Sequence, residues 1–404
     1  MPSPTPKRFD KRSSQGIVLV APTRTPIGKF GGGLASLTAA QLGTAAARAC
    51  LERSGCPPDR VDQAVFGHGR QAGGGPNTAR QISVKAGIPE DRPAFTINQA
   101  CASGLQAVFC AARSILLGEA QVVLAGGTES MSNTPYLLPR ARWGHRLGHG
   151  ELTDGMYRDG FDDPLSERVM GETAEELADQ EDISRSEADA WAVESQHRCQ
   201  KARQAHLFEA EISPVTVPHR RGDKIVSLDE HPREGVTAES LGRLKPVFRQ
   251  QGTVTAGNAS GITDGAAALL VASEEAATEL GLEPIARLID WSVVGVEPRI
   301  MGIGPVPAVE ALRERHSLTW DDVDQIELNE AFASQVLACL KHWDCDSKKV
   351  NPDGGAIALG HPIGCTGARL LVTLTHALAR RGGGRGLATL CVSGGMGVAA
   401  LVET

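Results

Sequence analysis

The ten residues Asn98–Ala107, with the sequence NQACASGLQA, decide how the fold of this chain is interpreted. The strand-like run 94–97 precedes them, and Leu105 and Ile115 belong to an apolar helical pattern that follows. Cys101 is therefore predicted on a tight turn between a strand and a helix, where backbone N–H groups are unpaired and the helix dipole favours negative charge. This position favours a thiolate nucleophile, although a free cysteine is also often a small buried hydrophobe.

The composition sets limits on the class of protein. With 404 residues, 41% hydrophobic content and 46 glycines, the chain fits a tightly packed α/β protein of two or three domains. A net charge of −7 argues against nucleic acid or a membrane surface as a partner. Nine scattered cysteines without a CxxC pair predict no disulfide framework, no metal site and a reducing, cytoplasmic location. The basic start, residues 1–14, is predicted to be a frayed tail rather than a targeting signal.

Short β-branched runs alternate with helical patterns through much of the chain. Strands are predicted at 17–20, 61–66, 122–125 and 265–272, and helices at 38–53 and 78–86. This alternation predicts parallel sheets with right-handed crossovers. The region 132–251 interrupts the pattern, because it is richer in charged residues and proline.

A short internal match indicates a duplication. The segment RVDQAV at 60–65 resembles DVDQIE at 322–327, with an offset of 262 residues. The same offset carries Cys101 into GHPIGC at 360–365, which also precedes a helical pattern and contains His361. The chain is therefore predicted to be a duplicated α/β unit with an inserted middle, in which Cys101 and His361 occupy related turns that a pseudo-twofold axis brings together.

Polar residues gather on predicted turns among small residues in the second half. Asn329 begins NEAFA, His361 follows a glycine-rich run, and Cys391 begins CVSGGMG. A lone histidine or cysteine is more often structural than catalytic. Together with Cys101, however, these residues fit a thiolate–imidazole nucleophile supported by a second thiol.

These motifs resemble those of the thiolases, a family that includes acetyl-CoA acetyltransferases and 3-ketoacyl-CoA thiolases. The resemblance extends over about residues 16–404 and includes GGAIALGHPIG at 354–364. It implies two thiolase-like α/β halves in a five-layered αβαβα core with an inserted loop domain. The N-terminal half is predicted at 16–131 plus 252–283, the loop domain at 132–251 and the C-terminal half at 284–404.

The resemblance also implies catalytic roles. Cys101 becomes acylated while His361 takes its proton. Cys391 removes the α-proton of a second acetyl-CoA in condensation and protonates the acetyl-CoA enolate in the reverse reaction. A water held by Asn329 forms one oxyanion hole with His361. Backbone N–H groups of Cys101 and of the turn at Ser393 and Gly394 form the other, although the family often has glycine where Ser393 stands. Coenzyme A thioesters are substrates, and no metal or other cofactor is expected.

Contacts to the substrate follow from the same resemblance. Arg233 and Ser240 are expected near the nucleotide of coenzyme A and Ser260 near its pantetheine arm, within a region of local basic excess. Three further residues match positions that line the acyl pocket: Met170, Met301 and Phe332. The segment 132–152, which contains Trp143, matches the loop through which homodimers pair into homotetramers.

The implied function is the Claisen condensation of two acetyl-CoA to acetoacetyl-CoA, or thiolysis of short-chain 3-ketoacyl-CoA, by a ping-pong route through an acyl-cysteine. A degradative thiolase for longer chains in fatty-acid oxidation is the main alternative. A decarboxylating enzyme of the same fold would use two histidines with the cysteine, and Cys391 argues against it. A non-catalytic lipid-binding or scaffold protein would be favoured by loss of Cys101, His361 or Cys391, and all three are present.

Overall fold

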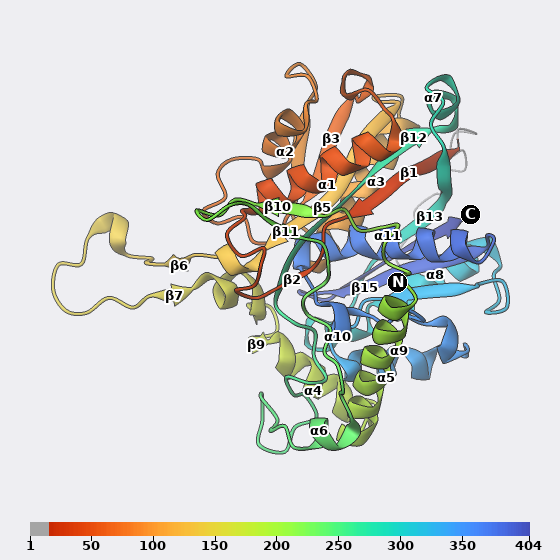
Figure 1. Cartoon of the computed structure of the whole chain (residues 1–404). Helices are drawn as coiled ribbons and strands as arrows, with labels where there is room; N and C mark the ends of the chain where they lie inside the picture. Colours follow the sequence, from red (N-terminus) through yellow and green to blue (C-terminus); the bar gives the residue numbers. More distant parts are fainter. Residues whose placement is uncertain (1–15) are drawn as a thin grey trace, which may run out of the picture.

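The computed structural model describes residues 16–404, so the basic segment 1–14 lies outside the described residues. Its centre is a ten-stranded sheet with the order β14-β15-β16-β13-β1-β12-β5-β3-β4, with β2 paired to β12 (Figure 1). The strands are β1 (Ile17–Arg24), β2 (Gly28–Lys29), β3 (Gln63–Gly67), β4 (Ala94–Ile97), β5 (Val122–Ser130), β12 (Thr263–Ser273), β13 (Pro284–Gly295), β14 (Gln325–Leu328), β15 (Arg385–Val392) and β16 (Met396–Glu403).

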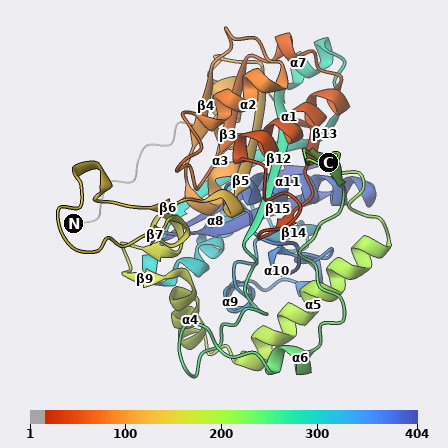
Figure 2. The same cartoon turned by 60° about the vertical axis from the view of Figure 1, so that its left-hand side comes forward.

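Three layers of helices and the two parts of this sheet alternate to form a five-layered core. Helices α3 and α11 pack between its N-terminal and C-terminal parts, while α1 and α2 cover one outer face and α8 and α9 the other (Figures 1 and 2). The helices are α1 (Ala39–Ser54), α2 (Thr78–Ala86), α3 (Ser103–Leu116), α4 (Met170–Gln180), α5 (Arg185–Gln204), α6 (Ala238–Gly242), α7 (Glu274–Glu279), α8 (Pro305–His316), α9 (Ala333–His342), α10 (Ala356–Leu359) and α11 (Ile363–Arg380). The αβαβα core is therefore confirmed.

The strand directions differ from the prediction of parallel sheets. Strand β3 runs parallel to β4 and β5, and β14 runs parallel to β15, but the central pairs are antiparallel. Strands β15 and β16 are joined by the three residues 393–395, and so short a connection permits only an antiparallel hairpin. The prediction was wrong at the centre because a run of apolar residues does not reveal the direction of the neighbouring strand.

The two segments of the internal repeat make the same backbone and side-chain hydrogen bonds. The Asp62 carboxylate accepts from the backbone N–H of Val122 at 3.0 Å, and the Asp62 N–H donates to the Val122 carbonyl. In the second half, the Asp324 carboxylate accepts from the backbone N–H of Arg385 at 2.9 Å, and the Asp324 N–H donates to the Arg385 carbonyl. The equivalent aspartates thus fix equivalent strand pairs, β3 with β5 and β14 with β15.

Glycines allow α3 and α11 to cross closely. A Cβ at Gly104 would lie 2.8 Å from the Ala368 nitrogen, and one at Gly367 would lie 2.5 Å from the Leu105 nitrogen. Any side chain at either position would push the helices apart. Because α3 follows the turn of Cys101 and α11 follows His361, this crossing brings the two predicted site segments together.

Other boundaries were predicted closely. Thr38 caps α1 through a capping box, and Gly55 ends it in the left-handed conformation at φ 67°. The predicted helix at 78–86 and strand at 94–97 have the observed bounds of α2 and β4.

The middle region contributes α4, α5, α6 and short strand pairs. These are β6 (Tyr136–Leu137) with β7 (Thr153–Asp154), β8 (Asp162–Asp163) with β9 (Arg168–Val169) and β10 (Val215–Val217) with β11 (Lys224–Val226). The segment between β6 and β7 forms an arm that projects from the body (Figure 1). Trp143 on this arm is 89% exposed. Within residues 16–404, no helix has both the length and the apolar character needed to cross a bilayer.

Candidate active site

Cys101 lies in the single 3-10 turn Ala100–Ala102, directly between β4 and α3, as predicted. Ala100 has φ 44°, in the left-handed region that costs a non-glycine residue about 1 kcal/mol or more. Two side chains hold this strained turn. The Asn98 Oδ1 accepts from the Ala100 N–H at 3.0 Å, and the Ser103 hydroxyl accepts from the Gln99 N–H at 2.9 Å. The strained turn thereby presents the thiol at the end of the strand.

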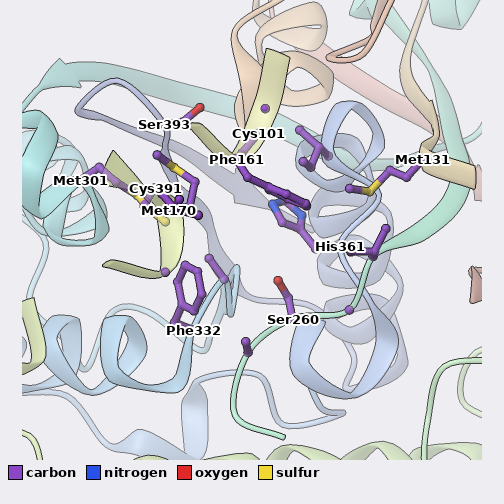
Figure 3. Close-up of a pocket in the computed structure, with 18 of the residues that line it drawn as sticks. Cys101, Met131, Phe161, Met170, Ser260, Met301, Phe332, His361, Cys391 and Ser393 are labelled. Carbon is purple, nitrogen blue, oxygen red and sulfur yellow. The ribbon is translucent and has the colours of Figure 1, made fainter. Parts of the chain in front are cut away.

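Three groups from distant parts of the chain line one cavity (Figure 3). Cys101 comes from the turn before α3, His361 from the loop before α11, and Cys391 from the end of β15. The remaining lining is mostly apolar and includes Met131, Phe161 and Phe248. The side chains that sequence motifs singled out separately therefore share a single space.

The hydrogen bonds of His361 determine which ring nitrogen is free. Its Nδ1 lies 2.6 Å from the Thr366 hydroxyl, which in turn donates to the Pro362 carbonyl at 3.0 Å. Since the hydroxyl has only one proton to donate, His361 carries its proton on Nδ1. The unprotonated Nε2 lies 3.5 Å from the Asn329 side-chain amide nitrogen. His361 thus presents a lone pair that can accept a proton.

The imidazole is held neutral. Burial lowers the pKa of His361 to about 3, and the positive charges of Arg369 and Arg70 lower it further. Glu129 acts in the opposite direction without reversing the effect. At neutral pH the ring is therefore a base and not a cation.

Both thiols are protonated in the resting enzyme. Burial raises the pKa of Cys101, although Arg70 and the backbone N–H groups of Ser393 and Cys101 oppose this shift. Burial also raises the pKa of Cys391 well above its usual range, and the nearby Cys101 adds to the effect. The prediction that the turn alone gives a thiolate was therefore wrong, because desolvation outweighs the backbone dipoles. Cys101 needs a proton acceptor, and His361 shares its cavity.

The hairpin turn between β15 and β16 lies beside Cys101. Among its described residues, the positive φ angles belong to Gly394 at 84° and Gly395 at 83°, and not to Ser393. Serine therefore fits at position 393 without strain, which removes the concern raised by the usual glycine there. A backbone N–H of this turn, that of Ser393, points to the Cys101 thiol.

The predicted substrate residues separate into two groups. Ser260, Met170, Met301 and Phe332 line the cavity with the catalytic groups (Figure 3). Arg233 and Ser240 do not line it. The Arg233 N–H donates to the Gln196 side chain, and the exposed Ser240 caps α6, its hydroxyl donating to the Thr237 carbonyl.

Sequence reasoning missed the residue that joins the two halves of the site. The buried Glu129 carboxylate accepts from the backbone N–H groups of Gly69, Arg70 and Gly364 at 2.8–3.1 Å, and His68 lies 3.2 Å away. Burial works to raise the pKa of Glu129, but His68, the positive charge of Arg70 and the Gly364 N–H lower it below the usual value. A carboxylate at the end of the apolar run of β5 was the signal available in the sequence.

Arg70, Tyr157 and Phe161 also line the cavity and were not predicted. No group of histidine, cysteine and carboxylate side chains in residues 16–404 is arranged to hold a metal ion. Two protonated thiols around a neutral imidazole, in a mostly apolar cavity, are suited to chemistry on an acyl thioester.

Comparisons with known proteins agree with this arrangement. The family model of the thiolase N-terminal domain matches residues 17–275, and that of the thiolase C-terminal domain matches residues 282–404. The acetyl-CoA acetyltransferase of Allochromatium vinosum is 48% identical over 391 residues, covering 96% of this chain and 99% of that protein. The one from Cupriavidus necator is 48% identical over 388 residues, covering 96% and 99%. This chain belongs to the thiolase family.

Solved structures give the same result. The Bacillus anthracis acetyl-CoA acetyltransferase matches with a TM-score of 0.95 and 46% identity, covering 97% of this chain and 100% of that one. The human mitochondrial 3-ketoacyl-CoA thiolase matches with a TM-score of 0.94 and 42% identity, covering 96% and 99%. Because proteins with both names match the fold equally well, the fold alone does not determine the preferred acyl chain.

Proposed function

We propose that this protein is a thiolase that condenses two acetyl-CoA to acetoacetyl-CoA, or cleaves short-chain 3-ketoacyl-CoA in reverse, through an acyl group on Cys101. The observation that carries this proposal is the shared cavity of Cys101, His361 and Cys391. The full-length similarity to acetyl-CoA acetyltransferases supports it.

In condensation, the Cys101 sulfur attacks the thioester carbonyl while His361 accepts its proton, and coenzyme A leaves as a thiol. His361 passes that proton to the departing sulfur and then takes the proton of Cys391, whose thiolate removes the α-proton of a second acetyl-CoA. The carbanion attacks the acyl carbon, and the released Cys101 sulfur recovers its proton from His361. In thiolysis, Cys101 attacks the 3-keto carbon while His361 takes its proton, the bond between C2 and C3 breaks, and Cys391 protonates the acetyl-CoA enolate. Free coenzyme A then gives its proton to Cys391 and takes the acyl group, and Cys101 recovers its proton from His361. Each step needs a donor aimed at the developing oxyanion.

Two groups of donors are available for the oxyanions. The backbone N–H groups of Cys101 and of the turn at Ser393 and Gly394 serve the acyl-enzyme. His361, which carries a proton from Cys391 on its Nε2 at this stage, donates to the enolate together with a water held by Asn329. The Asn329 Oδ1 is buried and, among the described residues, has no hydrogen-bond partner, which supports a water at this position. Every proton moves between these side chains and the substrate, so the reaction requires no cofactor.

The loop domain at 132–251 holds coenzyme A. Arg233 and Ser240, which do not line the cavity, contact the nucleotide of coenzyme A, and Ser260, which does line it, contacts the pantetheine arm. The two halves at 16–131 plus 252–283 and at 284–404 supply the catalytic groups. The basic residues of 219–224 and 233–245 complement the phosphates of coenzyme A.

Met170, Met301 and Phe332 form the acyl end of the cavity together with the catalytic sulfur of Cys391, in one packed cluster. Their bulk favours short acyl chains. The degradative thiolase for longer chains remains the alternative, and it predicts that thiolysis becomes faster as the chain lengthens.

The arm at 132–152 pairs two homodimers into a tetramer. Its exposed Trp143 and Leu147 are large apolar side chains without intramolecular cover. All nine cysteines are free, which supports a reducing compartment such as the cytoplasm.

The test is the absorbance of the magnesium enolate of acetoacetyl-CoA. An active thiolase removes this absorbance when enzyme and free coenzyme A are both present. Stable absorbance with the purified protein would contradict the proposal and favour a lipid-binding or scaffold protein. A series of 3-ketoacyl-CoA chain lengths in the same assay separates the short-chain from the long-chain alternative.

A further inference from the structure

Arg70 is a charged residue in an unusual place. It follows β3, which ends at Gly67, and only 7% of its surface is exposed. It lines the same cavity as Cys101 and lies close enough to act electrostatically on both Cys101 and His361. The mechanism above gives this guanidinium no role.

The Arg70 guanidinium forms no direct ion pair with the residues that the structure describes. Within residues 16–404 no carboxylate lies within ion-pair distance of its side chain, and its Nε is buried without a hydrogen-bond partner. Glu129 is the carboxylate that acts on it at longer range. The Glu129 oxygens, however, already accept from three backbone N–H groups and lie beside His68.

The surroundings make space for the guanidinium. A Cβ at Gly160 would lie 2.0 Å from the Arg70 Nη2, so only glycine allows the side chain to lie where it does. Tyr157 and Phe161, on either side of Gly160, line the same wall. The missing side chain of Gly160 thus leaves room for the Arg70 guanidinium at this wall of the cavity.

The described residues that line the cavity carry a positive charge and no negative charge. Among the described lining residues, Arg70 is the only permanent charge, because His361 is neutral and no aspartate or glutamate is present. Burying a guanidinium without a directly bonded carboxylate is unfavourable, and Glu129 acts on Arg70 only from a distance, whereas a forked guanidinium pairs well with a carboxylate. An unsubstituted acetyl group offers no negative charge to this side chain.

We propose that Arg70 binds a carboxylate at the far end of the acyl group, so that this thiolase acts on 3-oxoacyl-CoA thioesters of dicarboxylic acids. This inference rests on the thiolase activity proposed above. The acyl group on Cys101 then carries its own counter-ion for the buried guanidinium. The phosphates of coenzyme A are the other anions of the substrate, but they lie a full pantetheine arm away from the acyl carbon that Cys101 attacks.

The experiment compares two substrates that differ in one terminal group. 3-Oxoadipyl-CoA ends in a carboxylate where 3-oxohexanoyl-CoA, with the same number of carbons, ends in a methyl group. The seven-carbon pair, 3-oxopimelyl-CoA and 3-oxoheptanoyl-CoA, covers a longer reach. All four release acetyl-CoA on thiolysis, so chromatography of this one product gives kcat/KM for the wild type, Arg70→Leu and Arg70→Lys.

We expect the wild type to prefer the carboxylated member of at least one pair. Arg70→Leu should lower the ratio of carboxylated to uncharged kcat/KM by about 30-fold or more, because a buried charge pair is lost. Arg70→Lys, which keeps the charge but not the fork, should recover part of that ratio. The ratio does not depend on the fraction of correctly folded enzyme, and mass spectrometry of the wild type should find succinyl or glutaryl groups on Cys101.

Other outcomes overturn the inference. A wild type that cleaves 3-oxohexanoyl-CoA and acetoacetyl-CoA but rejects both carboxylated thioesters contradicts it. An Arg70→Leu variant that slows both members of a pair equally would show that Arg70 acts on the thiol or on the coenzyme A phosphates instead. If the wild type cleaves no thioester at all, the thiolase activity itself fails, and the inference fails with it.

Discussion

At the scale of single residues, burial determines how the site works. It keeps Cys101 and Cys391 protonated and at the same time keeps His361 neutral, because each charged form is disfavoured in an apolar cavity. The Cys101 thiolate therefore forms only when substrate is bound, by transfer of the Cys101 proton to the His361 imidazole. An exposed thiolate would be available for oxidation between turnovers.

Thr366 tests the tautomer of His361. Replacing Thr366 by valine removes the acceptor of the Nδ1 proton, so Nε2 is no longer held as the free base. We expect kcat for thiolysis to fall by about 10- to 100-fold, less than the full contribution of a general base because the imidazole itself remains, with little change in KM. Thr375→Val is the matched control, because the Thr375 hydroxyl bonds to carbonyls of its own helix. Equal effects of the two substitutions would contradict this role.

The pH dependence tests the depressed pKa of His361. A folded-state pKa of about 3 means that the ring is neutral throughout the range above it. We expect acylation of Cys101 to be flat between about pH 5 and 8, whereas an ordinary histidine would lose activity below about pH 6.5. An acetyl thioester of N-acetylcysteamine, which has no phosphates, is the suitable substrate. An acid limb centred near pH 6.5 would disagree with this account.

At the scale of elements, the crossing of α3 and α11 positions the site. It depends on glycines where no Cβ fits, and Gly127 of β5 is the tightest, since a Cβ there would lie 2.1 Å from the Gly364 carbonyl oxygen. This backbone contact holds the loop of His361 against the sheet from which the turn of Cys101 emerges. The crossing is thus a requirement of catalysis as well as of stability.

Gly127→Ala should separate these elements. We expect it to destabilise the fold by about 1–3 kcal/mol through overpacking and to lower the rate of Cys101 acylation. The control is Gly242→Ala in α6, where nothing lies within 4 Å of the added Cβ and the change should be neutral or slightly stabilising. Thermal unfolding and acylation kinetics measure both effects. A Gly127→Ala variant as stable and as active as the control would contradict this picture.

Sequence reasoning succeeded for elements with local signals. Thr38 and Gly55 predict the two ends of α1. The strand pattern before Cys101 and the helical pattern after it predict the turn on which Cys101 lies. It failed for strand direction, because local sequence does not reveal which strand lies alongside. It also missed Glu129 and Arg70, because local sequence does not reveal which groups surround a buried charge. The duplicated aspartates, Asp62 and Asp324, provided the long-range information that was available.

At the scale of the whole molecule, the arm at 132–152 extends away from the core and contributes only its base to the body (Figure 2). We expect Trp143→Ser together with Leu147→Ser to convert the proposed tetramers to dimers while leaving thermal unfolding of the core nearly unchanged. Size-exclusion chromatography with light scattering measures this change. A wild type that is already dimeric, or a variant that remains tetrameric, would rule out the arm as the tetramer contact.

The central claim is that two sulfurs divide the labour around one imidazole. Its most direct measurement is acetyl transfer from radiolabelled acetyl-CoA to protein, alongside acetoacetyl-CoA formation, in the wild type, Cys101→Ser and Cys391→Ala. The account predicts no stable acetyl-enzyme for Cys101→Ser, and an acetyl-enzyme on Cys101 without condensation for Cys391→Ala. Label on the Cys101 peptide of the serine variant, or equal loss of both steps in Cys391→Ala, would contradict it.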